Sequence, residues 1–545
     1  MSQTFSSYVR IRVTYLVATC RLDMPPRPPS LAPLRSVGLP TASLKTNATM
    51  DGLLKLKPLY TQLGDKIDEG DNASLLGQYV FPATIVFTVV VFLFEFYLDL
   101  RQRRAYQVTK FPSELAKTVG SIDADTGKAG SSAASSGDEA KGKKKVDGEI
   151  DTHKPLLPQL QKKFDKSQAY GLDKVNFSLA SQIYGTFEAI AFLLLGFFPY
   201  CWDKSASWAE STFGWTETDN EIKVTLIFLL VTTIVGIITG LPFEIYSTFQ
   251  IERKHGFNKQ TAGLFITDKI KSLVLTIVIG GPFVALLLKI IKWGGEHFYL
   301  YVWAFTFVFS VFMMTIVPVV IMPMFNKYEP LKDGPLKTQI YALADQLKYP
   351  LTKLFVMDGS KRSSHSNAFM FGFGKNKRIV LFDTLLEQVH DDEILAILGH
   401  ELGHWKLGHT LSNFAITQLY TGAAFYCFSL CYTSHDLYRA FGFDGEERPV
   451  PTIIALMLFF MTLWAPVDKV LSFLLTIFSR INEFGADRFS HGLGMSKKLQ
   501  SGLVKISLEN LGAMCPDPLY STYHYSHPPL VERLNAMIEL DKKEK

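Results

Sequence analysis

The sequence predicts an all-α polytopic membrane protein. Hydrophobic residues make up 48% of the 545 residues, Phe alone occurs 42 times, and the mean hydropathy is +0.14. These values are high for a soluble protein of this length and indicate helices that face lipid. Apolar stretches near the ~20 residues that a bilayer core requires recur at about 78–99, 180–201, 223–246, 268–291, 298–322, 411–433 and 451–476. We therefore expect seven spans.

Composition also excludes other classes of protein. The formal net charge is only +5, and no basic stripe with interleaved aromatic residues suggests a nucleic-acid partner. Of the five cysteines, only Cys427 and Cys431 have metal-type spacing. Both lie in one apolar stretch, where thiols that face lipid or the core are the favoured interpretation. A disulfide framework is not indicated.

The spans divide the chain into alternating membrane and polar regions. Within the first membrane region, Gly, Ser, Ala and Lys dominate a stretch that offers little apolar area to bury, so we expect a disordered insertion. The predicted regions are an irregular N-terminal extension (1–75), spans one to five (76–322, with the insertion at 112–156), a polar region (323–410), spans six and seven (411–476) and a C-terminal polar region (477–545).

The distribution of charge predicts the orientation in the membrane. Cytosolic loops carry an excess of Lys and Arg, and here such residues follow spans one, three and five, whereas the loops after spans two and six are rich in acids. The N-terminus should therefore be lumenal, and both polar regions should be cytosolic. Because they lie on the same side, 323–410 and 477–545 can build one site.

The first of these polar regions contains a metal-binding pattern. His400 and His404 are four residues apart in a strongly helical segment, so both imidazoles project from one face and can reach the same Zn²⁺. Glu401 is next to His400 and can reach a metal-bound water without binding the metal. In this H-E-x-x-H arrangement, the Glu serves as the general base of a metalloprotease.

A catalytic zinc needs a third protein ligand and an open position. His409 is out of register, because a metzincin would need its third His at position 410, where Thr410 stands. We interpret His409 as a structural or interfacial histidine. Glu483 is the better candidate, with Asp487 one helical turn later to orient a ligand histidine. On spacing alone, an ordinary solvated face of Glu and Asp is the favoured interpretation of this pair, so the third ligand stays open.

Several motifs together resemble the type I CAAX prenyl proteases, which are seven-span zinc endopeptidases of the endoplasmic reticulum and inner nuclear membrane. The similarity covers roughly residues 78–540, apart from 112–156. It is carried by 98–102 (LDLRQ), 364–368 (SHSNA), 400–410 (HELGHWKLGHT), 482–487 (NEFGAD) and 524–533 (HYSHPPLVER). The chain departs from the family at Gly485, where Gln is usual, and at Arg488, where a small residue is usual.

The resemblance implies a role for each matching residue. It implies zinc ligands at His400, His404 and Glu483, Glu401 as the catalytic base, and Asp487 in support of the metal shell. His527 resembles the family histidine near the scissile carbonyl, with Arg533 close by as a substrate-binding residue. Asn367 and Ala368 resemble an edge segment that pairs with an extended substrate backbone.

The resemblance also implies a fold and a function. Seven helices would surround an intramembrane chamber, with a cytosolic-side zinc metallopeptidase domain that contains a short β segment. The expected substrates are prenylated, for example farnesylated, CAAX proteins, which the isoprenoid anchors in the bilayer and from which the last three residues are removed. A broad-specificity quality-control zinc protease of the membrane is the alternative. A non-enzymatic scaffold is disfavoured, because His400, Glu401, His404 and Glu483 are all intact.

Two further features leave alternatives open. Acidic residues within the spans would face the chamber or form interhelical hydrogen bonds; these are Glu95, Glu188, Glu244 and Asp468. Lys542 and Lys543, near the C-terminus, resemble a retrieval signal of the endoplasmic reticulum, and a solvated charged tail is an equally good interpretation.

Overall fold

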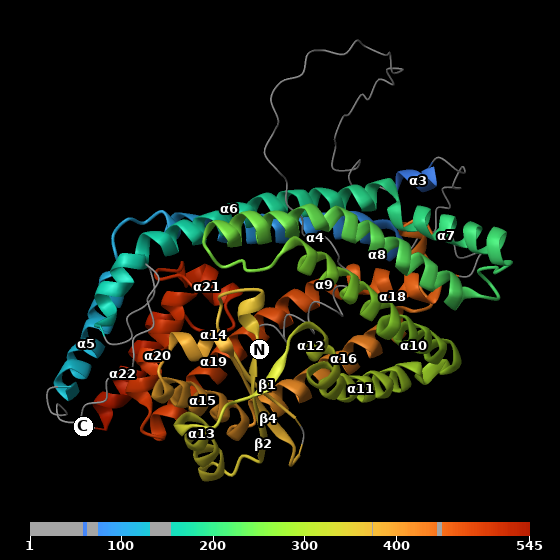
Figure 1. The fold of residues 1–545 in the computed structure, drawn as a ribbon. Coiled ribbons are helices and arrows are strands. Elements are labelled where there is room, and N and C mark those ends of the chain that lie inside the picture. The colour runs from blue at the N-terminus through green and yellow to red at the C-terminus, as the bar shows by residue number, and fades with distance from the viewer. Residues whose placement is uncertain (1–57, 63–74, 131–153, 373, 444–449, 545) are drawn as a thin grey trace.

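A computed structural model describes residues 58–62, 75–130, 154–372, 374–443 and 450–544 (Figure 1). Within these ranges, six helical segments are long and apolar enough to cross a membrane, and a bent pair of helices makes a seventh if it is one span. The spans consist of α4 (Leu75–Tyr106), α6 (Leu156–Leu195), α8 with η1 (Glu221–Tyr246, Ser247–Glu252), α9 with η2 and α10 (Ala262–Leu275, Thr276–Gly280, Gly281–Trp293), η3 with α11, η4 and α12 (Gly295–His297, Phe298–Ile316, Val317–Ile321, Met322–Phe325), α16 (His409–Cys431), and the pair α18 (Thr452–Met461) and α19 (Ala465–Gly492), bent by 57°. The predicted polytopic fold class is confirmed.

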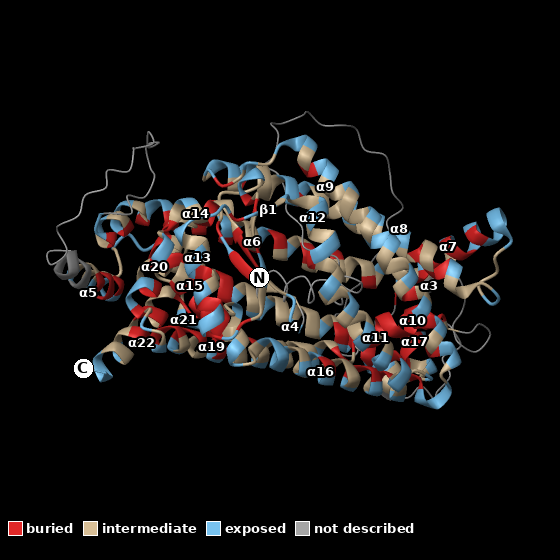
Figure 2. Ribbon diagram, turned by 60° about the horizontal axis from the view of Figure 1, so that its bottom comes forward, coloured by how far each residue is buried: buried red, intermediate tan, exposed pale blue. Residues whose placement is uncertain are grey.

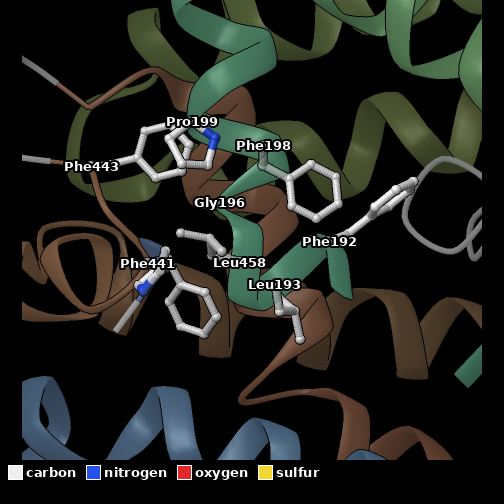
Figure 3. A pocket seen from close by; sticks show the side chains of 9 residues that line it. Phe192, Leu193, Gly196, Phe198, Pro199, Phe441, Phe443 and Leu458 are labelled. Carbon is white, nitrogen blue, oxygen red and sulfur yellow. The ribbon is translucent and has the colours of Figure 1, made fainter. Parts of the chain in front are cut away.

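The second span is displaced from its predicted place. The prediction was 180–201, whereas the helix begins at Leu156 and ends at Leu195. It ends there because Gly196 takes a left-handed φ of 72°, which glycine adopts at little cost. A Cβ at this position would lie 2.7 Å from Tyr60 Cβ. The helix α7 (Phe197–Phe213) starts directly after the break. A small apolar pocket lies here, lined by Phe192, Leu193, Phe198, Pro199, Phe441, Phe443 and Leu458 among others (Figure 3).

The insertion differs from the prediction. Disorder was expected over 112–156, but Ser113–Gly130 forms a helix, α5, so that part of the prediction is wrong. Leu115, Val119 and Ile122 are buried on one side of it, as their helical spacing allows. The Asp123 carboxylate accepts hydrogen bonds from the Leu156 and Leu157 amides at 2.8 and 2.9 Å, which fixes the start of α6. Residues 131–153 lie outside the described residues, as does most of the predicted extension 1–75.

The polar regions fold around a small sheet. Its strands are β1 (Tyr328–Pro330), β2 (Leu351–Met357), β3 (Ala368–Phe371) and β4 (Lys377–Phe382), in the order β1-β2-β4-β3. The pairs β1–β2 and β3–β4 are antiparallel, and β2–β4 is parallel. The other short elements are α3 (Leu59–Gln62), α13 (Pro335–Gln346), η5 (Gly359–Lys361), α14 (Asp383–Gln388), α15 (Asp391–Lys406), α17 (His435–Ala440), α20 (Ser496–Glu509), α21 (Pro518–His524) and α22 (Leu530–Lys543).

Buried residues gather mainly toward the two ends of the long helices (Figure 2). One cluster joins apolar residues of α4, α6, α7, α8, α10, α11 and α16 to α18. A second joins α5 and the start of α6 to the sheet, α13 to α15, α20 and α22. Within the most apolar window of each of the six spans, only 6 to 28% of the residues are buried, as expected for helices that face lipid.

Close packing joins the two polar regions through α15 and α19. Two glycines of α15 allow this approach, because a Cβ at Gly399 would lie 3.1 Å from Met495 Sδ and a Cβ at Gly403 would lie 3.0 Å from Phe489 Cδ1. The Ser490 hydroxyl donates to the Ala396 carbonyl at 3.1 Å across the same contact. Residues 323–410 and 477–545 thus meet in one body, as a shared location on one side of the membrane would allow.

Three of the four acidic residues within the spans have partners on neighbouring helices. Lys469 Nζ of α19 lies 2.8 Å from Glu95 Oε1 of α4, Tyr420 of α16 donates to Asp468 of α19 at 2.6 Å, and Glu244 of α8 pairs with Lys269 of α9. These contacts favour the interhelical interpretation of the acids over free carboxylates in the chamber.

Candidate metal centre

Three side chains converge where α15 meets α19. His400 and His404 project from one face of α15, and their Nε2 atoms are 3.2 Å apart. Glu483 of α19 faces both, with Oε2 3.5 Å from His400 Nε2 and Oε1 3.4 Å from His404 Nε2. One ligand atom from each residue lies within 4.8 Å of the others. The candidate for the third ligand, which spacing alone left open, therefore lies opposite the two histidines.

The chemistry of this cluster fits a divalent metal. The Glu483 side chain is 1% exposed, yet its Oε2 atom accepts no hydrogen bond among the described residues. A buried carboxylate oxygen without a partner is costly, and a cation bound between the three residues would satisfy it. Two imidazoles and one carboxylate also match the ligand set of catalytic zinc, which keeps one position open.

Asp487 and Arg533 lie behind the first ligand. His400 Nδ1 donates to Asp487 Oδ1 at 2.8 Å, which leaves Nε2 free to bind the metal. Arg533 contacts the same carboxylate twice, with Nη2 2.6 Å from Oδ1 and Nε 2.8 Å from Oδ2. The Arg533 side chain is 9% exposed, so its guanidinium faces Asp487 and Glu483 rather than open space.

His409 holds the second ligand. It is the first residue of α16, and Gly408, with a φ of 74°, turns the chain back from α15. His409 Nδ1 lies 2.9 Å from His404 Nδ1, so with Nε2 of His404 toward the metal, Nδ1–H donates to His409. The register argument set His409 aside as a ligand but did not reveal this contact; Gly408, the residue before it, was the available signal in the sequence.

The pKa of His400 reflects these neighbours. Burial opposes protonation, but the hydrogen bond to Asp487 and the nearby carboxylate of Glu483 outweigh it and raise the pKa from 6.5 to about 9. Metal binding requires the neutral imidazole, so a proton and a metal compete for this side chain at neutral pH.

Glu401 is partly exposed beside His400. Within the described residues, no hydrogen bond or ion pair holds its carboxylate, so it can accept a proton from a water at the metal. This placement fits the base predicted from the H-E-x-x-H pattern.

His527 approaches the cluster from the loop between α21 and α22. Its Nε2 lies 3.1 Å from Glu483 Oε1, and 35% of its side chain is exposed, so the ring is partly accessible from outside. Burial lowers the pKa of His527 below 6.5. The imidazole is therefore neutral at pH 7, and its other ring nitrogen, Nδ1, lies 3.2 Å from Ser526 Oγ.

Asn367 and Ala368 lie at the edge of the sheet. Ala368 begins β3, which pairs only with β4 among the described strands. The Asn367 carbonyl accepts from the Phe382 amide at 3.0 Å, and its side chain accepts from the Ala368 amide at 2.8 Å. The opposite side of β3 is free of strand partners there, as a strand that receives an extended peptide must be.

The two departures from the family pattern have different surroundings. A Cβ at Gly485 would lie 3.4 Å from His409 Cε1, so this position is beside the residue that holds His404. Arg488 is exposed. The helix α19 continues through both positions.

Comparisons with known proteins agree on one family. Residues 102–327 match the model "CAAX prenyl protease N-terminal, five membrane helices", and residues 330–541 match "Peptidase family M48". The chain is 44% identical over 465 residues to a CAAX prenyl protease 1 homolog of Arabidopsis thaliana, covering 85% of this chain and 99% of the relative. It is 40% identical over 497 residues to the Homo sapiens homolog, covering 84% and 95%. A crystal structure of S. mikatae Ste24p superposes with a TM-score of 0.70 at 37% identity, covering 84% and 98%.

Proposed function

The chain belongs to the CAAX prenyl proteases of peptidase family M48, and we propose that it removes the last three residues of prenylated CAAX proteins with zinc and Glu401. It is a multi-pass membrane metallopeptidase. The observation that carries the proposal is the convergence of His400, His404 and Glu483 beside an unengaged carboxylate, Glu401.

Zinc bound by His400, His404 and Glu483 would act as a Lewis acid and lower the pKa of a bound water toward ~7. Glu401 accepts the proton of the attacking water and delivers it to the leaving amine. Asp487 keeps His400 in the tautomer that leaves Nε2 free, because its carboxylate takes the Nδ1 hydrogen.

His527 is proposed to donate a hydrogen bond to the oxygen of the scissile carbonyl as negative charge develops there. Its neutral, partly exposed imidazole supports this role. A fixed donor of this kind is typically worth ~2.7–4 kcal/mol. Arg533 is proposed to act at the site mainly through Asp487, since its two shortest contacts go to that carboxylate.

The peptide is proposed to bind as an added strand along β3, from Asn367 and Ala368 onward. Main-chain hydrogen bonds provide affinity that depends little on side chains, which suits a protease that accepts varied C-terminal tripeptides. The isoprenoid would stay among the spans, where lipid already holds it.

The proposed location is the endoplasmic reticulum membrane, and also the inner nuclear membrane, with the metal centre and C-terminus cytosolic and the N-terminus lumenal. The helix α5, which follows span one, packs against the C-terminal helix α22. This packing supports a location of both helices on the same side of the membrane. Thr118 of α5 donates to Asn535 of α22 at 2.8 Å.

The test is cleavage of a farnesylated CAAX peptide by the purified protein, with its unprenylated counterpart in parallel. We expect release of the C-terminal tripeptide from the farnesylated peptide, and loss of this activity with a chelator or with Glu401→Gln. Equal cleavage of the unprenylated peptide would instead support a broad-specificity quality-control protease.

A further inference from the structure

The motif at 98–102, which is far from the metal motif in sequence, has no role in the mechanism above. It forms the end of the first span, α4. Arg101 Nη2 lies 2.9 Å and Nε 3.0 Å from Asp517 Oδ2. The neighbouring Gln102, which is 1% exposed, accepts a hydrogen bond from the Asp517 amide at 2.8 Å. Both side chains therefore hold one residue of the C-terminal region.

Asp517 in turn starts the short helix α21. Its carboxylate accepts from the Leu519 and Tyr520 amides at 3.1 and 3.0 Å, which caps the helix. The other end of α21 also rests on α4, because Tyr523 donates to Glu95 Oε1 at 3.3 Å and packs edge-on against Phe94. The first span thus contacts α21 at both ends.

The helix α21 leads directly to His527. The Tyr525 amide still bonds to the Ser521 carbonyl at 3.0 Å, and His527 follows two residues later, 3.1 Å from Glu483. Glu95 also pairs with Lys469 of α19, the helix that carries Glu483. The span α4 therefore touches both elements whose separation sets the distance between His527 and the metal ligand.

We propose that Arg101 and Gln102 are positioning residues that act through Asp517 and α21 to hold His527 at the scissile carbonyl. This inference rests on the proposed role of His527. A two-pronged contact between Arg and a carboxylate fixes orientation as well as distance. Displacement of a catalytic group by about 1 Å can lower the rate by as much as ~100-fold. Loss of the contact between Arg101 and Asp517 should therefore lower the rate of cleavage.

The ion pair between Arg101 and Asp517 is partly exposed, so its effect on catalysis can be measured without a large loss of stability. The Arg101 side chain is 36% exposed and that of Asp517 12%, and ion pairs of this kind contribute little to folding. Removing the contact should therefore leave a folded, metal-bound protein in which His527 is misplaced.

The experiment compares Arg101→Ala in the wild-type chain and in His527→Ala, using the full-length protein and a farnesylated peptide. We expect Arg101→Ala to lower kcat roughly tenfold, with KM and bound zinc unchanged. In the His527→Ala background, the same substitution should change kcat by less than about twofold, because coupled residues are not additive.

Arg103→Ala is the matched control. Arg103 is on the same helix end and contributes the same positive charge beside the membrane, but its Nε donates to Asn176 of α6 at 2.7 Å rather than to α21. Its substitution should leave kcat unchanged. Asp517→Asn is the second variant, because Asn still caps the helix but loses the charged contact; it should lower kcat by a smaller factor and also lose its effect in His527→Ala.

Three results would overturn the proposal. Unchanged kcat in both Arg101→Ala and Asp517→Asn would show that the contact does not position His527 for catalysis. An equal loss in the two backgrounds would show that Arg101 acts elsewhere. If His527→Ala itself had wild-type kcat, the role of His527 would fall and this inference with it, whereas the zinc and Glu401 chemistry would stand.

Discussion

Replacing His409 by Ala removes the acceptor that holds Nδ1–H of His404. The contact is a hydrogen bond of 2.9 Å between two imidazoles. Such a bond between neutral groups contributes ~0.5–1.5 kcal/mol. At 1.4 kcal/mol for each tenfold change in affinity, His409→Ala should weaken zinc binding by about 2- to 12-fold.

The loss of zinc affinity in Asp487→Asn is the reference for the loss in His409→Ala. Asp487 accepts from His400 at 2.8 Å, its side chain is 2% exposed, and its charge strengthens the bond. Loss of an outer-shell partner typically lowers metal affinity about 10- to 100-fold, so Asp487→Asn should fall at the upper end of that range and His409→Ala below it. Since Asp487→Asn also weakens the contact with the buried Arg533, thermal unfolding should be recorded for each variant.

The assay is competition for zinc between the purified protein and a chelator of known affinity, at one pH. His435→Ala serves as the control, because His435 is exposed at the start of α17 and should bind zinc as the wild type does. Wild-type zinc affinity in His409→Ala, or a loss larger than that of Asp487→Asn, would refute the reasoning.

Three further predictions follow from the same geometry. Glu401→Gln should retain zinc and lose turnover by about 10²–10⁴-fold, measured by metal analysis and peptide cleavage; loss of the metal would make Glu401 a ligand. His527→Ala should lower kcat by about 10²–10³-fold with zinc retained, and a zinc-deficient variant would instead place His527 in the metal shell. Because the pKa of His400 is raised to about 9, zinc affinity should rise about tenfold per unit between pH 7 and 9, and affinity that does not change with pH would contradict this. The same shift means that charged His400 stabilises the chelator-treated protein fully below pH 6.5, and this contribution is lost as pH rises through about 9.

Hydropathy predicted the spans, although the second is displaced, and helical spacing predicted that His400 and His404 share one face, because both patterns are local. The third ligand was different. Glu483 reaches His400 through the close approach of α19 to Gly399 and Gly403 of α15, and nothing in its own spacing showed that approach, so resemblance to the family was needed. The contact between His409 and His404 depends on the turn at Gly408, a signal that the register argument did not use.

The helix α5 shows a second limit of prediction from sequence, namely the use of average composition. The predicted disorder relied on the average composition of 112–156, which the Gly, Ser and Lys residues dominate. Leu115, Val119 and Ile122 occupy one helical face and are buried, so three well-spaced apolar residues outweighed the average. Periodicity within a segment is the better guide when its two halves differ in composition.

The most direct test of the metal centre is X-ray absorption at the zinc edge on the purified protein, combined with metal analysis of Glu483→Gln. We predict one zinc per chain, held by nitrogen and oxygen ligands at about 2.0–2.2 Å, and a marked loss of zinc in the variant. A sulfur ligand near 2.3 Å, or wild-type zinc in Glu483→Gln, would contradict the assignment of His400, His404 and Glu483 as the ligands.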